Sequence, residues 1–168
     1  MASNISKGAK QLVKRYQVLP KALYRIQGKL PVKLRDYDTQ MAKGRTSYDL
    51  KLHNGKVMPA EGDEWIGPNG MSLRPPTDTM LGILDDWRKG EPTIFRFYEG
   101  MRLYEDDLVL IHERDDHYSL QTTVPIELQE FNDKLTKLLE EAPKQTVQQF
   151  RELMEDEDDQ DNWRKNDK

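Results

Sequence analysis

Three short apolar runs followed directly by an amphipathic helix pattern constrain this chain most. TIFRFYEG (93–100), DLVLIHE (107–113) and YSLQTTV (118–124) are rich in the β-branched and aromatic residues that favour strands. IELQEFNDKLTKLLEEA (126–142) instead has apolar residues at helical spacing. Strands with flanking helices predict an α+β fold. The stripe of the helix consists of Leu128, Phe131, Leu135, Leu138 and Leu139.

The rest of the chain adds shorter elements. ALYRIQ alternates apolar and polar residues and predicts a strand from Ala22 to Gln27. Asp36 to Gly70 is rich in Gly, Pro, Asn and charged residues, so we expect long loops with short structured pieces. Helices are predicted over Thr79–Lys89, which Gly90 would end, and over Val147–Met154, which Thr146 would cap.

The charge distribution divides the chain of 168 residues, a length that suits one compact domain. We predict a basic, helix-forming segment over 1–20, the domain itself over 21–142, a C-terminal helix over 143–154 and a disordered acidic tail over 155–168.

The basic segment leaves several interpretations open. The first acidic residue is Asp36, after nine Lys and Arg residues. An amphipathic helix here would suit organelle targeting, an anionic membrane or nucleic acid, but a solvated surface helix is the commoner case. The acidic pI of about 5.5 weighs against nucleic-acid binding. The helical face would consist of Ile5, Ala9, Leu12, Val13 and Tyr16.

Several chemistries are excluded by composition and spacing. The chain has no cysteine, so disulfides, zinc thiolates and a cysteine nucleophile are ruled out. No apolar run approaches the roughly 20 residues that span a bilayer. His112 and His117 are five apart rather than the four of a helical zinc motif, and the only further histidine, His53, is distant in sequence. We therefore predict no metal site, and no phosphate-loop or GxSxG motif is present.

Three segments in succession carry a family resemblance. LYRIQGKL, DEWIGPNGMSLRPP and the long stretch from YEGMRLYEDD to DHYSLQTTVPIELQEFNDKL together resemble the type VI secretion cytotoxins with an ADP-ribosyltransferase-toxin-like fold and their fungal relatives. The resemblance covers about Ala22 to Leu139. It implies two facing antiparallel or mixed sheets with flanking helices around a cleft that binds NAD.

The resemblance also implies cofactor-binding residues. Arg25 occupies the place of the first-strand residue that contacts NAD, beside Tyr24, and its planar fork suits phosphate. A surface ion pair is the structural alternative for this arginine. Ser72 matches a hydroxyl residue that holds the nicotinamide ribose, with Met71 next to it and Gly70 permitting close backbone approach. The alternative for Ser72 is a turn hydroxyl.

A His-Tyr pair at the start of a cleft strand is the most specific part of the resemblance. His117 is expected to support the reacting ribose, and Tyr118 to contact the cofactor. Because neighbours on a regular strand point to opposite faces, only one of them can face the cleft. The glutamate usual on a late strand is replaced by Gln121, and the nearest upstream carboxylate is Glu113.

The function implied is an NAD-dependent ADP-ribosyltransferase-like toxin that acts in the cytoplasm on an unknown target macromolecule. Such a toxin needs a neutralising immunity protein in its producer. An NAD glycohydrolase and an inactive binding module on the same fold remain alternatives, because Gln121 cannot supply negative charge. Trp65, Trp87 and Tyr98 are candidates for an aromatic face for nicotinamide, with core packing as their commoner role.

Overall fold

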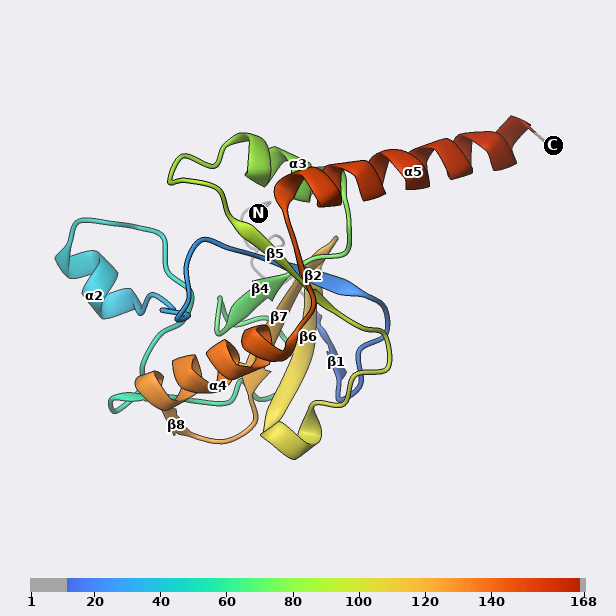
Figure 1. Ribbon diagram of the computed structural model, residues 1–168. Coiled ribbons are helices and arrows are strands. Elements are labelled where there is room, and N and C mark those ends of the chain that lie inside the picture. Colours follow the sequence, from blue (N-terminus) through green and yellow to red (C-terminus); the bar gives the residue numbers. More distant parts are fainter. Residues whose placement is uncertain (1–11, 167–168) are drawn as a thin grey trace, which may run out of the picture.

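The computed structural model describes residues 12–166, with side chains described as far as Asp156. It confirms the predicted α+β class and lays out its elements around a central group of antiparallel strands (Figure 1). The strands are β1 (Lys14–Tyr16), β2 (Leu23–Gln27), β3 (Lys56–Val57), β4 (Met71–Leu73), β5 (Thr93–Phe97), β6 (Leu108–Arg114), β7 (His117–Thr122), β8 (Ile126–Glu127) and β9 (Lys144–Gln145). The helices are α2 (Tyr37–Ala42), α3 (Asp78–Asp85), the 3-10 turn η1 (Tyr104–Asp106), α4 (Leu128–Glu141) and α5 (Val147–Asn166).

Two antiparallel sheets are joined where β2 meets the end of β4. One has the strand order β1-β6-β7-β4 and the other β2-β5-β9, and β3 with β8 forms a small third sheet. The backbone N–H of Tyr24 donates to the carbonyl of Arg74 at 2.7 Å, and the N–H of Arg74 donates back at 3.0 Å. This pair ties β2 to the end of β4, so the residues beside it in both sheets lie close together.

The central strands and helices agree with the sequence pattern, with small changes at their ends. The strand expected over Ala22–Gln27 is β2, and the three apolar runs are β5, β6 and β7. The helix expected to reach Lys89 ends at Asp85. In α4, Phe131, Leu135 and Leu139 are buried, as their helical spacing predicts.

The first correction concerns the basic segment over 1–20, which was predicted to form a helix. Ile5 and Ala9 lie outside the described residues, but Lys14–Tyr16 form a strand that pairs with β6. Val13 donates from its N–H to the carbonyl of Asp63 at 2.9 Å, so this stretch is extended rather than helical. The open edge of β6 supplies backbone partners that local helical periodicity cannot reveal.

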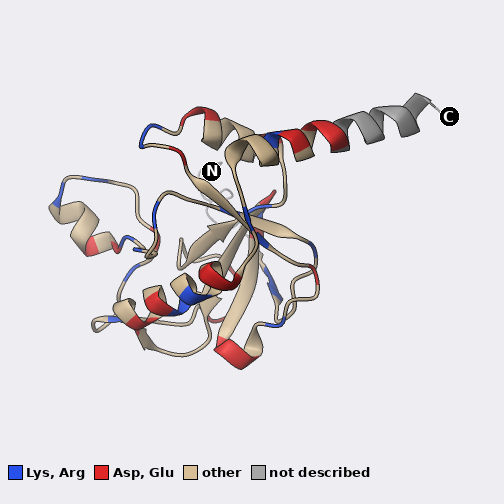
Figure 2. Ribbon diagram, viewed as in Figure 1, with Lys and Arg blue, Asp and Glu red and all other residues tan. Residues whose placement is uncertain are grey.

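The second correction concerns the predicted end of the C-terminal helix. α5 continues to Asn166, where the sequence predicted a helix ending at Met154 and then a disordered tail. No Gly or Pro follows Pro143, so nothing in the sequence stops this helix. Figure 1 shows α5 projecting beyond the sheets, and Figure 2 shows acidic residues along α3, α4 and α5. No described helix is long and apolar enough to cross a membrane.

Two apolar clusters hold the elements together. The larger one fills the space between α4 and the inner faces of both sheets. The smaller one joins the start of α5 to β2 and α3, because Phe150 packs edge-on against Tyr24 with ring centroids 5.4 Å apart. Its other buried members are Met80, Leu84, Ile94 and Met154.

Candidate functional site

Two cavities adjoin where the sheets meet. A cavity of 480 Å³, here the basic cavity, is lined by Arg25, Lys29, Lys33 and Trp87 among others. A second cavity of 580 Å³, here the histidine cavity, is lined by Trp65, Glu113, Arg114, His117 and Ser119 among others. The two cavities share four lining residues, Arg35, Asp49, Ser72 and Arg74.

Ser72 is placed between the cavities by the alternation of β4. Its neighbours Met71 and Leu73 are buried in the larger apolar cluster, so the serine side chain points to the other face of the sheet. There its Oγ lies 3.0 Å from Nε2 of His117. The hydroxyl therefore has a histidine partner across the sheet rather than a local turn amide.

His117 and Glu113 are brought together by an irregularity in the β6–β7 hairpin. His112 pairs with Tyr118 and Arg114 pairs with His117, which leaves Glu113 as the extra residue of a β-bulge. Its carboxylate is 4% exposed, and Oε2 lies 2.7 Å from Nδ1 of His117. Nδ1 nonetheless makes no hydrogen bond to the described residues. The imidazole thus lies between a hydroxyl and a buried carboxylate.

Gln121 lies behind this group and does not line the histidine cavity. Its Nε2 donates to Oγ of Ser119 at 3.3 Å and lies 3.5 Å from Oε1 of Glu113. Its Oε1 accepts from Nδ2 of Asn69 at 3.3 Å. At 2% exposure, Gln121 supports the carboxylate from the protein side. Of the two side chains, only Glu113 lines the histidine cavity.

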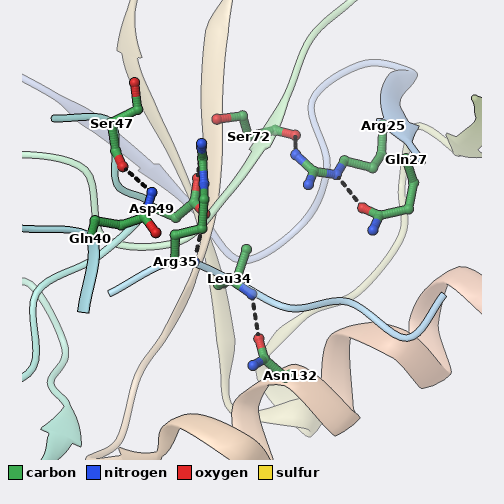
Figure 3. Close-up of polar contacts among 9 residues, drawn as sticks. All are labelled: Arg25, Gln27, Leu34, Arg35, Gln40, Ser47, Asp49, Ser72 and Asn132. Carbon is green, nitrogen blue, oxygen red and sulfur yellow. Dashed lines mark hydrogen bonds and ion pairs between the residues drawn. The ribbon is translucent and has the colours of Figure 1, made fainter. Parts of the chain in front are cut away.

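Arg25 points from β2 to the junction, as Figure 3 shows. Its Nε donates to Oε1 of Gln27 at 3.0 Å and its Nη1 to the carbonyl of Ser72 at 3.3 Å. Burial lowers the pKa of Arg25 to about 10, although the charge of Asp49 opposes this. The side chain remains charged at neutral pH, and both hydrogen-bond partners are neutral oxygens. The surface ion pair considered from the sequence is therefore not what holds it.

Two further arginines at the junction were not identified from the sequence. Arg35 lies 3.0 Å from each carboxylate oxygen of Asp49, and these hydrogen bonds raise its pKa (Figure 3). Arg74 Nε is buried without a hydrogen bond, 3.8 Å from Oδ1 of Asp116. Asp116 accepts from Thr77 Oγ1 at 2.5 Å. Burial acts to raise the pKa of Asp116, but this hydrogen bond and Arg74 bring it below its usual value.

Of three residues expected to contact a cofactor, Tyr118 and Met71 are buried in the apolar core, and Tyr24 lines the basic cavity. Tyr118 is 3% exposed in the apolar core and stacks on His112 with ring centroids 4.2 Å apart. Met71 is fully buried on the same face as Tyr118. The ring of Tyr24 packs on Phe150, and its backbone rather than its ring orders the junction. Because neighbouring residues of a strand point to opposite faces, His117 and Ser72 face the cavities, and Tyr118 and Met71 face the core.

The three candidate aromatic residues lie at different places in the structure, and the two histidines of the hairpin point apart. Trp65, which is 40% exposed, lines the histidine cavity, and Trp87 lines the basic cavity. Tyr98 lies away from both, against the guanidinium of Arg96. His112 and His117 point to opposite faces of the hairpin. Among the side chains described, those of residues 12–156, no group of His, Asp or Glu could hold a metal ion.

Gly70 lines the histidine cavity and lies too close to β7 for a side chain. A Cβ built there would lie 2.2 Å from the carbonyl oxygen of Leu120 on β7. We predict that Gly70→Ala destabilises the protein by about 1–3 kcal/mol, as overpacking does. Chemical denaturation would measure this loss.

Gly82 in α3 provides the matched control, because its Cβ would meet nothing within 4 Å. Gly82→Ala should stabilise the protein by about 0.5–1 kcal/mol through better helix propensity. Equal denaturation midpoints for the two variants would contradict the close approach of β4 to β7.

The chain was compared with known protein families, curated proteins and solved structures. A family model described as Tse2 ADP-ribosyltransferase toxin matches residues 21–150. No curated protein and no solved structure matches the chain. The matched region contains both cavities and all of their charged residues named above.

Proposed function

The chain belongs to the Tse2 ADP-ribosyltransferase toxin family, and on this premise we propose that it binds NAD across the two cavities and transfers ADP-ribose to a cellular macromolecule. The observation that carries the proposal is the position of Ser72, which lines both cavities and contacts His117. Arg25, Arg35 and Arg74 would hold the diphosphate at the junction. His117 and Glu113 would face the nicotinamide ribose.

The size and charge of the site support NAD as the ligand. Single ligand pockets measure about 300–1,000 Å³, and two adjoining cavities of 580 and 480 Å³ suit the two nucleotide halves of NAD. Guanidinium groups bind phosphate oxygens through paired donors. The buried Nε of Arg74 has no hydrogen-bond partner within the described residues, so it is a donor for which a ligand oxygen would be a partner.

The chemistry of the proposed reaction asks for negative charge near the ribose. Cleavage of the bond to nicotinamide develops positive charge on the ribose, which an oriented carboxylate stabilises. Gln121 cannot supply this charge, but Glu113 lies beside His117 and is buried, where its field is little screened. Trp65 would offer an aromatic face at the same cavity.

The test is incubation of the purified protein with NAD and a cell lysate, followed by mass spectrometry. Release of nicotinamide with ADP-ribose attached to a lysate component would support a transferase and identify its target. Release without attachment would instead indicate an NAD glycohydrolase. Absence of both, with no binding of NAD at millimolar concentration, would favour an inactive binding module. A cytoplasmic site of action and a neutralising immunity protein are part of the same proposal.

Arg25→Gln is expected to weaken NAD binding by about tenfold to 150-fold, because a hydrogen bond to a charged group contributes about 1.5–3 kcal/mol. Isothermal titration calorimetry would measure the change in Kd. Arg88→Gln makes the same charge change on an exposed residue outside both cavities and should leave Kd unchanged. Equal affinities for the two variants would remove Arg25 from the NAD site.

A further inference from the structure

Ser72, His117 and Glu113 are arranged as a hydroxyl, a base and a carboxylate in series. Ser72 Oγ lies 3.0 Å from His117 Nε2, and His117 Nδ1 lies 2.7 Å from Glu113 Oε2. The first distance is within the reach of a nucleophile and its general base. The second contact is close, although Nδ1 makes no hydrogen bond to the described residues. This arrangement has a chemical consequence beyond holding NAD.

The carboxylate beside His117 favours one position for the proton of the imidazole. An ionised carboxylate accepts hydrogen bonds and cannot donate them, so beside an ionised Glu113 a neutral imidazole would carry its proton on Nδ1. Nε2 would then accept the hydroxyl hydrogen of Ser72. The lone pairs of the serine oxygen would be directed away from the histidine.

Glu113 and His117 are held next to each other in a largely buried environment. The Glu113 side chain is 4% exposed, and that of His117 is 17% exposed. A buried carboxylate without a polar partner would be costly, so the bulge of β6 and the amide of Gln121 hold it against the imidazole. Ser72 is only half-buried and lines both cavities, so a small molecule can reach its Oγ.

We propose that Ser72 is a base-activated nucleophile, with His117 as its general base and Glu113 as the residue that orients His117, and that acylating and phosphonylating electrophiles modify its Oγ. With a fluorophosphonate, the bond from Oγ to phosphorus forms and the phosphorus–fluorine bond breaks. Fluoride leaves, and the serine proton passes to His117 Nε2. No oxidant or second reactant is required.

Arg74 supplies the remaining requirement, a donor for the anion that forms on the attacked centre. Its guanidinium lines the histidine cavity together with Ser72, and its buried Nε makes no hydrogen bond to the described residues. A preorganised cationic donor in a partly buried cavity stabilises developing negative charge more strongly than water does. The same side chain would serve an NAD phosphate, so the electrophile and NAD should compete.

The test uses a fluorophosphonate probe with the full chain, followed by intact-mass measurement and peptide mapping. Wild-type protein should gain one probe adduct on Ser72, and Ser72→Ala should gain none. His117→Ala should slow labelling by about 100-fold or more, since general bases contribute about 10²–10⁴-fold. Ser47→Ala is the matched control, because this exposed serine lines the same cavity and bonds Gln40 only through its backbone carbonyl. It should label like the wild type.

Glu113→Gln tests the orienting role and should slow labelling by at least about tenfold. Because a buried substitution can unfold the protein, nitrogen chemical shifts of His117 in the wild-type protein give a second readout. They should show the proton on Nδ1. A proton on Nε2, or equal labelling of folded wild type and His117→Ala, would overturn the proposal.

This inference shares its residues with the proposed function but does not depend on NAD turnover. Labelling of Ser72 without nicotinamide release would support the nucleophile and reject the transferase. Nicotinamide release from a well-folded protein that is not labelled would support turnover of NAD and reject Ser72 as a nucleophile.

Discussion

His117→Ala is expected to lower nicotinamide release from NAD by about 100- to 1,000-fold, the loss that follows removal of a preorganised group from a reaction site. His117 lies between two side chains, with Ser72 Oγ 3.0 Å from Nε2 and Glu113 Oε2 2.7 Å from Nδ1. The substitution therefore removes one side chain and separates the other two. The rate constant kcat should fall more than KM rises, because the group is proposed to act on the reacting ribose rather than on the diphosphate.

His53→Ala is the matched control for this experiment. His53 is an exposed histidine that lines neither cavity, so its loss should leave nicotinamide release within twofold of the wild type. Melting curves of both variants show whether folding is retained. A folded His117→Ala protein with undiminished turnover would exclude His117 from the chemistry and would leave Arg25 and Ser72 as binding residues only.

Local sequence pattern predicted part of the fold that carries the site. The apolar runs of 107–113 and 118–124 predicted β6 and β7, and the stripe of 126–142 predicted α4. β6 and β7 have continuous apolar runs because residues on both of their faces are buried. The short strand β4, which carries Ser72, was not predicted by its local pattern. The rule that strand neighbours alternate also indicated that only one of His117 and Tyr118 could face the cleft, and the structure selects His117.

The contacts that complete the site could not be predicted from local sequence pattern, because they join segments that are distant in sequence or irregular in structure. The bulge that turns Glu113 toward His117 leaves no local mark in the sequence. Asp49 lies within the stretch predicted as long loops, and it meets Arg35, which lies just before that stretch. Arg74 reaches the junction through its backbone pairing with Tyr24. Tertiary pairing also made Lys14–Tyr16 a strand, against their helical spacing.

Phe150→Ala is expected to lower the free energy of unfolding by about 3–5 kcal/mol, the cost of removing a buried aromatic ring. Phe150 is fully buried and meets Tyr24 edge-on. Its loss would open a cavity under β2, the strand that carries Arg25 on its other face. Because typical domains have only about 5–15 kcal/mol of stability, urea denaturation should show a large shift of the midpoint.

Gln148→Ala separates this effect from a general weakening of α5. Gln148 is exposed on the same helical turn, and its amide bonds only Glu152, so the substitution should change stability by less than about 0.5 kcal/mol. If Phe150→Ala were as mild, α5 would be an appendage of the domain, as a boundary at residue 142 implies. A large loss, with weaker NAD binding in the same variant, would instead make the first turns of α5 part of the support for Arg25. That outcome would agree with a family match that extends to residue 150.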